Sequence, residues 1–558
     1  MEHFKLPIEY CEKKTEIDGH ILKDLEILET VDENIPSASQ SIFRPTSKVS
    51  KLLLTNWVKY FSHDKKFIKD TQQIILKSNV NMYINIDDIY DCWNDLKNNC
   101  GFLTEYQYVD WEFFESFNRD SHFLQLMSVY NLLSPVISLI LPLIMCIIPF
   151  FLLKFKGISI SLSTYLNHLY ELMSKLPIGK LADMKNMSFD NKVYTIFSCL
   201  FYFFQLYQNV LSCWRFYKNQ FKIKIFIDKL KHFIKHTVEQ SKTYLSTSTN
   251  YLSHKHFNDD LEKNLSKMQE LYENLQKVSV ININKIGYNL QQFYLLYKCV
   301  DLNTLFQYAI GINAYFDNIN NIKTLYLSKH ISSCKFSNKY TTFKGAYHHS
   351  IHIDKAVKND YTTKYNTLIT GPNASGKTSI LKTVIINILF SQIIGFGFYD
   401  EAKINLYTNV HCYLNIPDTS GRDSLFQSEA RRCKDIIDII SKSNNRSRHF
   451  CVFDELYSGT NPCEATATAH AYLEYMSSIS NVDFMITTHY NKLCQIYRHK
   501  KIKPFHMKTK FIDGKLIYTY TLTQGTSNIK GAINILRELD YPRQIIDDTL
   551  DIISTDMK

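Results

Sequence analysis

Two stretches of the chain are apolar over a length that ordinary amphipathic helices do not reach. Residues 132–153, LLSPVISLILPLIMCIIPFFLL, carry no charge over 22 residues and are followed by Lys154 and Lys156. Residues 193–214 are equally long and uncharged, but they include two glutamines and an asparagine. A helix of about 20 apolar residues is long enough to span a bilayer. The pattern predicts two apolar helices within 131–215, which either form a membrane hairpin or are buried as core helices.

The segments on either side of these helices mix polar and apolar residues. Residues 1–130 show no sustained hydrophobic period and predict a mixed, mainly helical domain of unknown role. Within 216–344, apolar residues recur at steps of three and four, which is the spacing of one face of an α-helix. The clearest set is Leu261, Leu265, Met268, Leu271 and Leu275. We expect long amphipathic helices that pack on each other through such faces.

A phosphate-binding motif marks the last third of the chain. The residues GPNASGKT at 371–378 follow the apolar, β-favouring segment 366–370 and satisfy GxxxxGK(S/T). Glycines let the backbone turn so that successive amides point at phosphate, and the following helix presents its positive end to the same anion. Lys377 then reaches the β and γ oxygens, and Thr378 offers a hydroxyl to Mg²⁺. The expected nucleotide-binding residues are Gly371, Pro372, Asn373, Ala374, Ser375, Gly376, Lys377, Thr378 and Ser379.

A second motif supplies the carboxylates that a phosphate-binding loop needs for hydrolysis. The segment HFCVFDELYSGT at 449–460 ends an apolar strand with Asp454 and Glu455. We expect Asp454 to hold Mg²⁺ through water. Glu455 is then placed to orient or deprotonate the attacking water, because phosphoryl transfer chiefly requires positioning and charge stabilisation. Glu455 and Lys377 are thus candidate catalytic residues of an ATPase, and Asp454 is a candidate metal ligand together with Thr378.

Two further segments resemble the MutS family of DNA mismatch-repair proteins. DTSGRDSLFQSEARR at 418–432 looks like the family's signature segment, and MITTHYNKL at 485–493 looks like the segment with its switch histidine. The SGTNP at 458–462 resembles a glycine-threonine dimer-contact loop, and Asn359 stands where the family has an asparagine near the nucleotide base. The residues that carry the resemblance are Ser424, Phe426, Glu429 and His489. Gly371, Ser424, Asp454 and His489 follow one another at intervals of 53, 30 and 35 residues.

The resemblance implies a fold and a mode of action. Residues 345–558 are expected to form an α/β P-loop NTPase domain of the MutS type within the ABC superfamily. In such proteins two domains pair head to tail, so Ser424 would contact the γ-phosphate bound by the other subunit. His489, a further candidate catalytic residue, would sense the γ-phosphate. The implied cofactors are ATP and Mg²⁺. The implied partners are mismatched or branched DNA and a second subunit, in a homodimer or a MutS-like heterodimer.

The composition permits these partners without selecting one. The 64 Lys and Arg exceed the 54 Asp and Glu, and the net charge of +10 suits nucleotide, nucleic acid or an acidic membrane surface. The 13 cysteines include no CxxC pair, so neither a zinc ribbon nor a redox motif is indicated. The N-terminus has no apolar run after a basic start, so no cleaved secretory signal is expected. We expect an intracellular protein.

Two functional hypotheses follow from these patterns. The first is a DNA-binding ATPase of mismatch repair or recombination. The second is a membrane-anchored MutS-like ATPase with a non-repair partner and with its ATPase domain on the cytosolic side. Phe113 and Glu115 have the Phe-x-Glu spacing of the family's mismatch-reading element, but the context lacks a glycine-led strand and favours coincidence. The histidines near 350 fit no zinc spacing, so no metal site is expected there.

Overall fold

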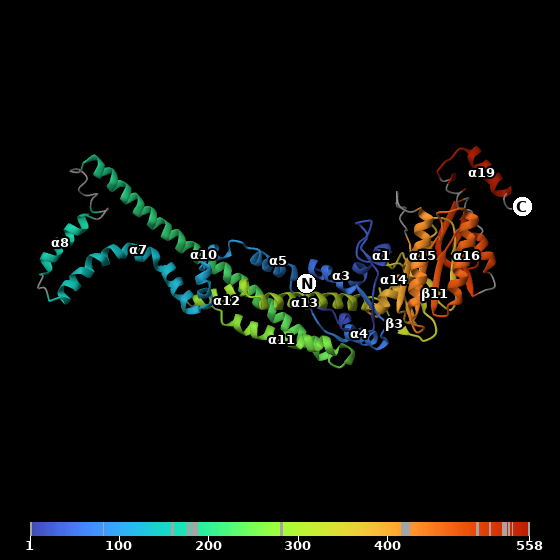
Figure 1. The fold of residues 1–558 in the computed structure, drawn as a ribbon, viewed down its shortest axis with the longest axis horizontal. Coiled ribbons are helices and arrows are strands. Elements are labelled where there is room, and N and C mark those ends of the chain that lie inside the picture. The colour runs from blue at the N-terminus through green and yellow to red at the C-terminus, as the bar shows by residue number, and fades with distance from the viewer. Residues whose placement is uncertain are drawn as a thin grey trace. The chain divides into compact units, whose positions relative to one another are not determined.

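The computed structural model describes a chain that forms two compact units, each assembled from separate stretches of sequence (Figure 1). The described residues are 3–81, 83–157, 161–175, 179, 188–278, 283–414, 424–497, 501–512, 515–526, 533, 536–537 and 539–555. Unit 1 comprises Met1–Asp87, Glu239–Leu265 and Gln307–Lys558, and unit 2 comprises Asp88–Val238 and Ser266–Phe306. The N-terminal residues therefore share a unit with the P-loop. The division of the chain into domains at 1–130, 131–215, 216–344 and 345–558 remains a prediction from the sequence.

The centre of unit 1 is a six-stranded sheet with the order β13-β12-β6-β11-β10-β9. Strands β12, β6, β11, β10 and β9 run parallel to one another, and β13 is antiparallel to its neighbour β12. The order places β11 between β6, which leads into the P-loop, and β10, which ends in the acidic pair. The strands are β6 Asn366–Thr370, β9 Asn409–Tyr413, β10 His449–Asp454, β11 Val482–Thr487, β12 Ile502–Ile512 and β13 Lys515–Gln524.

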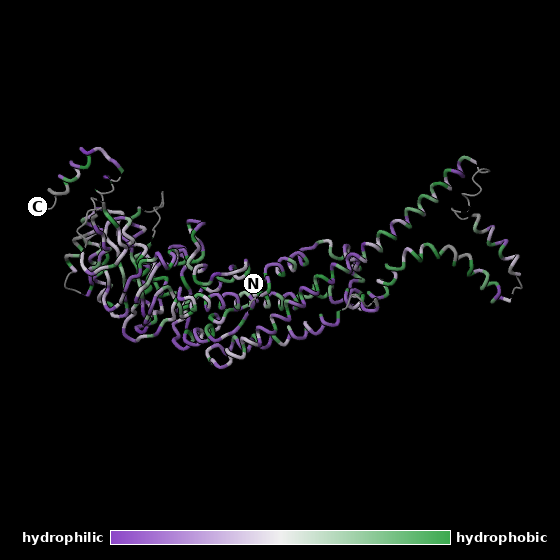
Figure 2. The backbone as a smooth tube through the Cα atoms, turned by 180° about the vertical axis from the view of Figure 1, so that it is seen from behind, coloured by the Kyte–Doolittle hydropathy of each residue, from purple (hydrophilic) through white to green (hydrophobic). Residues whose placement is uncertain are grey.

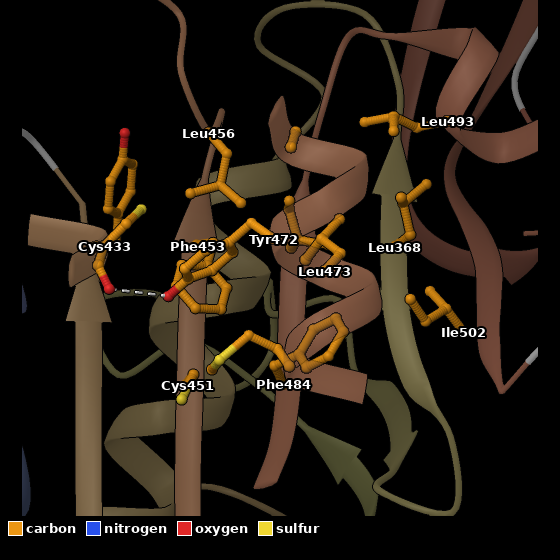
Figure 3. Close-up of a cluster of buried hydrophobic side chains, with 14 of the residues drawn as sticks. Leu368, Cys433, Cys451, Phe453, Leu456, Tyr472, Leu473, Phe484, Leu493 and Ile502 are labelled. Atoms are coloured by element: carbon orange, nitrogen blue, oxygen red, sulfur yellow. Dashed lines mark hydrogen bonds between the residues drawn. The ribbon is translucent and has the colours of Figure 1, made fainter. Parts of the chain in front are cut away.

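The hydrophobic cluster drawn in Figure 3 holds helices against this sheet. Phe453 of β10, Phe484 of β11 and Leu368 of β6 are buried together with Tyr472. The Tyr472 hydroxyl donates to the backbone carbonyl of Cys433 across 3.5 Å, which ties two helices of the layer together. Parallel strands buried on both faces read as continuous apolar runs, and β10, HFCVFD, has this pattern. The helices of this part are α14 Lys377–Ile393, α15 Leu425–Lys442, α16 Pro462–Ser478, α17 Asn491–Ile496 and α19 Arg543–Thr555.

A second, mixed sheet of five strands has the order β5-β4-β8-β3-β7. Helix α14 contacts β4 and β7 of this sheet as well as β10 and β11 of the larger one. A helix that packs on two sheets has little solvent face, and α14 is accordingly buried at every residue from Thr383 to Ile393. The strands are β3 Ser332–Phe336, β4 Thr342–Ala346, β5 Asn359–Thr362, β7 Phe396–Gly397 and β8 Glu401–Ile404.

The N-terminal residues pack into unit 1 through buried amide side chains. Gln72 donates to the carbonyl of Gly395 at 2.6 Å and to that of Cys334 at 3.0 Å, and Gln392 donates to the carbonyl of Ser62 at 3.0 Å. These bonds satisfy backbone groups that burial would otherwise leave without water. The elements here are η1 Pro7–Tyr10, β1 Lys14–Glu16, α1 Gly19–Asp24, α2 Ala38–Phe43, α3 Lys48–Trp57, β2 Tyr60–Ser62 and α4 Lys65–Lys77. Strands β1 and β2 form a two-stranded antiparallel sheet.

Unit 2 is helical in its described residues and has an aromatic core. Trp93 stacks on Phe306 with ring centroids 3.9 Å apart, and its indole N–H donates to Asn303 at 3.0 Å. Four helices, α5, α10, α11 and α13, have residues in both units. The predicted stripe from Leu261 to Leu275 is buried along α11, which confirms the amphipathic pattern. The helices with residues in unit 2 are α5 Ile86–Lys97, α6 Phe102–Glu105, η2 Glu112–Arg119, α7 Ser121–Phe155, α8 Leu162–Lys175, α10 Phe189–Ser248, α11 Lys255–Gln276, η5 Ile283–Lys285, α12 Ile286–Lys298 and α13 Val300–Leu327, while η4 Leu252–His254 lies in unit 1.

Candidate functional site

The expected catalytic residues meet at one edge of the six-stranded sheet. Strands β6, β11 and β10 are neighbours and parallel, so the residues that follow them emerge side by side. Two backbone bonds keep the three strand ends level: the Glu455 amide donates to the carbonyl of Thr487 at 3.2 Å, and the Thr488 amide donates to that of Ile369 at 3.0 Å. Ligands of parallel α/β sheets bind at this carboxyl edge. The topology therefore gathers the P-loop, the acidic pair and His489.

Glycine is required at both ends of the P-loop. Gly376 has φ +92°, and a Cβ at this position would lie 3.1 Å from the ring of Tyr520. A Cβ on Gly371 would lie 2.8 Å from Oγ of Ser375. Helix α14 starts at Lys377 without a side-chain cap, so its first amides are free to bind an anion. The Ser375 hydroxyl is buried and has no hydrogen-bond partner within the described residues, which fits a loop shaped around phosphate oxygens.

Lys377 lies inside the loop rather than in solvent. Its side chain is 6% exposed, and its Nζ donates to the carbonyls of Gly371 at 3.2 Å and Pro372 at 3.3 Å. Burial lowers the pKa of this ammonium from its ordinary value, against the opposing effect of Glu455 and Asp454. A cation that is partly desolvated and held by weak neutral acceptors is suited to pair with a phosphate.

Thr378 and Asp454 form the oxygen pair expected at a magnesium site. The Thr378 hydroxyl donates to Oδ2 of Asp454 at 2.7 Å, and the Thr487 hydroxyl donates to the other carboxylate oxygen. Mg²⁺ prefers oxygen ligands and keeps several waters, so one hydroxyl and one carboxylate fit this ion. No group of three or more His, Cys, Asp or Glu side chains that could hold a metal occurs in the described part of the chain. The donor set thus fits a magnesium ion carried with phosphates.

Glu455 and His489 face each other beside Lys377. The His489 Nε2 lies 2.8 Å from Oε1 of Glu455 and 3.2 Å from Nζ of Lys377. One ring nitrogen cannot donate to the first and accept from the second at once, and the shorter contact favours donation to the carboxylate. This hydrogen bond, with the charges of His489 and Lys377, lowers the pKa of Glu455 although burial opposes the shift. Glu455 is therefore held as a carboxylate next to the phosphate-binding loop.

The signature helix is fastened to the loop that follows the acidic pair. Glu429 is 2% exposed and accepts from the Ser458 amide at 3.0 Å, the Ser458 hydroxyl at 2.9 Å and the Gly459 amide at 3.2 Å. Phe426 packs against Tyr457 with ring centroids 5.8 Å apart. A Cβ on Gly459 would lie 2.8 Å from the Phe426 amide, so glycine allows this close approach. The described part of the signature segment, residues 424–432, is thus fastened to the 458–462 loop.

Ser424 stands at the exposed N-terminus of that helix. Its hydroxyl accepts from the Gln427 amide at 3.3 Å, and its own amide donates to the Gln427 side chain at 2.9 Å. This capping box fixes the first turn of α15. Ser424 itself is exposed, as a contact to a second subunit would require. The preceding part of the predicted signature, 418–423, lies outside the described residues.

A cavity of about 360 Å³ adjoins the P-loop and was not indicated by the sequence motifs. Tyr520 reaches it from a β-bulge, where β13 changes register opposite Lys508 and Thr509 and the Tyr520 backbone has φ +54°. The Asn359 side chain holds this bulge, since it donates to the Tyr520 carbonyl at 3.0 Å and accepts from the Leu522 amide at 2.7 Å. The lining includes Tyr347, His348, Val357, Asn359, Gly376, Ser379, Thr383, Met507 and Tyr520.

Two other features of the sequence, the Phe-x-Glu spacing at 113–115 and the histidines near 350, can be located in the structure. Glu115 accepts from the Tyr294 hydroxyl at 2.7 Å and pairs with Lys298 at 2.8 Å, while Phe113 is exposed. These contacts within unit 2 account for Glu115 without a nucleic-acid contact. Burial lowers the pKa of His348 to about 4 and that of His349 to about 3, so both rings are neutral at physiological pH.

The glycine-rich loop, its lysine and threonine, and the carboxylates at neighbouring strand ends define a P-loop nucleotide-binding α/β domain. Residues 367–556 match the family described as MutS domain V, and the resemblance of the C-terminal segment to MutS proteins is thereby confirmed. The chain is similar to an Endonuclease MutS2 of Staphylococcus haemolyticus, with 30% identity over 215 residues, which are 38% of this chain and 27% of the relative.

Other relatives match a similar share of the chain. An Endonuclease MutS2 of Staphylococcus aureus is 30% identical over 218 residues, 38% of this chain and 29% of the relative. A DNA mismatch repair protein MutS of Bacteroides fragilis is 29% identical over 199 residues, 35% of this chain and 22% of the relative. The chain thus spans about a quarter of the length of the curated relatives it matches.

Proposed function

We propose that this chain is a MutS-type ATPase that binds and hydrolyses ATP as a dimer and couples this cycle to DNA of mismatched or branched structure, in mismatch repair or recombination. One observation carries the proposal: Lys377, the pair Thr378 and Asp454, and the pair Glu455 and His489 lie together at the ends of three adjacent parallel strands. Such a convergence of cation, metal-type oxygens and carboxylate is what phosphoryl transfer to water requires.

Each residue has a distinct part in the proposed reaction. The P-loop amides and Lys377 bind the triphosphate, and Thr378 and Asp454 hold its Mg²⁺. The metal supplies charge stabilisation at the transferring phosphoryl group. Glu455, kept ionised by His489, accepts a hydrogen bond from the attacking water and orients it for in-line displacement. His489 is placed to respond to the terminal phosphate because it lies 3.2 Å from Nζ of Lys377.

The nucleotide base is proposed to lie in the cavity beside Gly376. A cavity of about 360 Å³ is large enough for a purine, and Tyr520 offers it an aromatic face. In this reading Asn359 acts through the backbone of β13, because both ends of its amide are bonded to that strand.

The dimer is proposed because Ser424 belongs to an exposed helix N-terminus, a natural binding place for phosphate. The contacts of Glu429 with the 458–462 loop let the signature helix move together with the acidic pair at Glu455. ATP that bridges two subunits would thereby couple hydrolysis to subunit arrangement. The names of the relatives and the net charge of +10 support DNA as the partner.

Complementation between two inactive variants tests the composite site. Lys377→Ala removes the phosphate cation of one subunit, and Ser424→Ala removes the serine that would complete the other subunit's site. In a head-to-tail dimer that carries one of each, one site lacks both groups and the other is intact. An equal mixture should therefore recover about one quarter of the parental ATPase rate, because half of the dimers are mixed. A mixture as inactive as either variant alone would contradict sites shared between subunits.

The coupling to DNA is tested separately on the parental protein. ATPase rate is measured with and without mismatched, branched and fully paired duplexes at several salt concentrations. We expect stimulation by the mismatched or branched forms that weakens as salt rises. Equal rates with and without every DNA would reject DNA as the partner while leaving the ATPase assignment intact.

A further inference from the structure

The outer parts of α7 and α10 in unit 2 expose large apolar side chains along their length. Two helices among the described residues are long and apolar enough to cross a membrane, Ser121–Leu141 within α7 and Phe189–Ser248. Figure 2 shows hydrophobic residues running along both helices. The exposed apolar residues include Leu133, Val136, Ile137, Leu139, Ile140, Leu141, Ile144, Ile147, Ile148, Phe151 and Leu152 of α7, and Ile196, Phe197, Leu200, Phe201, Phe203, Phe204, Tyr207, Val210 and Trp214 of α10.

These side chains form one broad face on each helix. Leu139, Ile140 and Leu141 are consecutive and all exposed, as are the pairs 200–201 and 203–204 of α10. Successive residues of an α-helix point about 100° apart, so the exposed apolar residues of each helix span about half of its circumference. No charged residue interrupts either face within 132–153 or 193–214, and a helix without charges over this length is suited to lipid.

Polar groups of the two helices instead face one another. The Asn209 side chain donates to the Ser138 hydroxyl at 2.5 Å, and the Tyr202 hydroxyl donates to the Ser138 carbonyl at 3.3 Å. The Cys213 thiol lies 3.5 Å from the Leu132 carbonyl. Polar groups within a bilayer are expected to pair between helices in this way. Gln205 and Gln208 remain exposed, which leaves α7 the more apolar of the two.

The same contacts set an antiparallel register that brings the uncharged runs level. Leu132 opens the first run, and it contacts Cys213, one residue before the end of the second. Each run has 22 residues, which is about 33 Å of helix and matches a hydrocarbon core of about 30 Å. Lys154 and Lys192 bound the far ends of the two runs, and Arg215 bounds the second run at its near end. Charged residues thus flank an uncharged region that is about as long as the hydrocarbon core of a bilayer is thick.

The proline-containing part of α7 also satisfies its backbone internally. Pro149 interrupts the regular hydrogen bonding of the helix, and the next amide, that of Phe150, donates to the hydroxyl of Tyr165 in α8 at 3.1 Å. Tyr165 is buried. In lipid a freed backbone amide must find a partner within the protein, and this bond supplies one.

We propose that residues 132–153 and 193–214 insert into a lipid bilayer as an antiparallel helical hairpin. Residues 154–192 then lie on one side of the membrane, and the chain before 132 and after 214 lies on the other side. The membrane anchor rests on α7 and α10 alone and does not depend on the proposed ATPase or on DNA.

Flotation of full-length protein with vesicles tests this assignment. Protein purified in mild detergent is reconstituted into vesicles of phosphatidylcholine with one part in four phosphatidylglycerol, treated with alkaline carbonate and floated on a density gradient. We expect the parental protein to float and to resist carbonate. The variant Ile140→Lys with Leu200→Lys places charges on the lipid-facing sides of the two helices, and its floating fraction should fall by about ten-fold or more.

A matched variant and a separate readout keep the result interpretable. Leu252→Lys with Leu327→Lys introduces the same charges at exposed leucines outside the hairpin and should float like the parental protein. ATP retention, measured on each variant in detergent, reports whether unit 1 has folded, and Lys377→Ala should float normally although it binds no ATP. The proposal would be overturned if the parental protein stayed at the bottom of the gradient or were stripped by carbonate. It would also be overturned if the variant Ile140→Lys with Leu200→Lys floated as well as the parental protein.

Discussion

His489 and Glu455 form a hydrogen-bonded pair, with Nε2 of the imidazole 2.8 Å from Oε1 of the carboxylate. The two residues follow adjacent parallel strands, β11 and β10, so the pair is a direct product of the strand order. It joins the residue expected to sense phosphate to the residue expected to orient water. A change in the contacts of His489 should therefore be felt by Glu455.

The pH dependence of hydrolysis should depend on this pair. The hydrogen bond from His489 lowers the pKa of Glu455, so the carboxylate stays ionised further into the acid range than an ordinary glutamate. In His489→Ala the pKa of Glu455 rises, and the acid limb of the kcat profile should move to higher pH. His352→Ala, which removes an exposed histidine paired with Asp354 at 3.2 Å, should leave the limb in place. An acid limb that is unchanged in His489→Ala would mean that His489 does not control Glu455.

Replacing the carboxylate itself should separate binding from hydrolysis. Glu455→Gln keeps the size of the side chain but cannot act as a base, so kcat should fall by about 10² to 10⁴-fold while ATP binding persists. The ATP-bound dimer should then accumulate, which sedimentation with and without ATP can detect. Glu401→Gln, which alters an exposed glutamate paired with Lys344 at 3.2 Å, is the matched control. Unchanged turnover in Glu455→Gln would assign the water-orienting role to another group.

The sequence predicted which residues meet at this site better than it predicted the packing around them. The P-loop, Asp454, Glu455 and His489 could be placed because each follows an apolar strand and phosphate chemistry demands particular residues at fixed local spacing. Gln72 could not be connected with Gly395 in this way, since more than 300 residues separate them and the bond exists only after folding. Tyr520 was missed for a related reason, because its position depends on a β-bulge that leaves no local sequence pattern.

The stability of the signature helix should depend on Glu429. Its carboxylate accepts three hydrogen bonds from Ser458 and Gly459 in a buried position. Glu429→Ala leaves these donors without partners, and the free energy of unfolding should fall by about 2 to 4 kcal/mol. Urea denaturation followed by circular dichroism measures the change. Glu464→Ala, which removes an exposed carboxylate bonded to Thr460, should change the free energy of unfolding by less than about 0.5 kcal/mol.

The cavity beside Gly376 predicts a selective effect on the nucleotide base. Tyr520→Ala removes the aromatic face and should weaken ATP binding by about ten-fold, or about 1.4 kcal/mol. Tyr520→Phe keeps that face and should bind ATP nearly as tightly as the parental protein. Asn359→Leu removes both bonds that hold the bulge, so it should weaken ATP binding although the P-loop is unchanged.

Competition with inorganic tripolyphosphate distinguishes a loss of base contacts from damage to the P-loop. This anion carries the phosphates without the base, so Tyr520→Ala and Asn359→Leu should bind it as the parental protein does. Lys377→Ala should lose tripolyphosphate and ATP together, because its cation contacts only the phosphates. Titration of a fluorescent ATP analogue against each competitor gives both constants in one experiment. Equal weakening of ATP and tripolyphosphate in Tyr520→Ala would place the base elsewhere and leave Tyr520 as a residue that packs on the P-loop at Gly376.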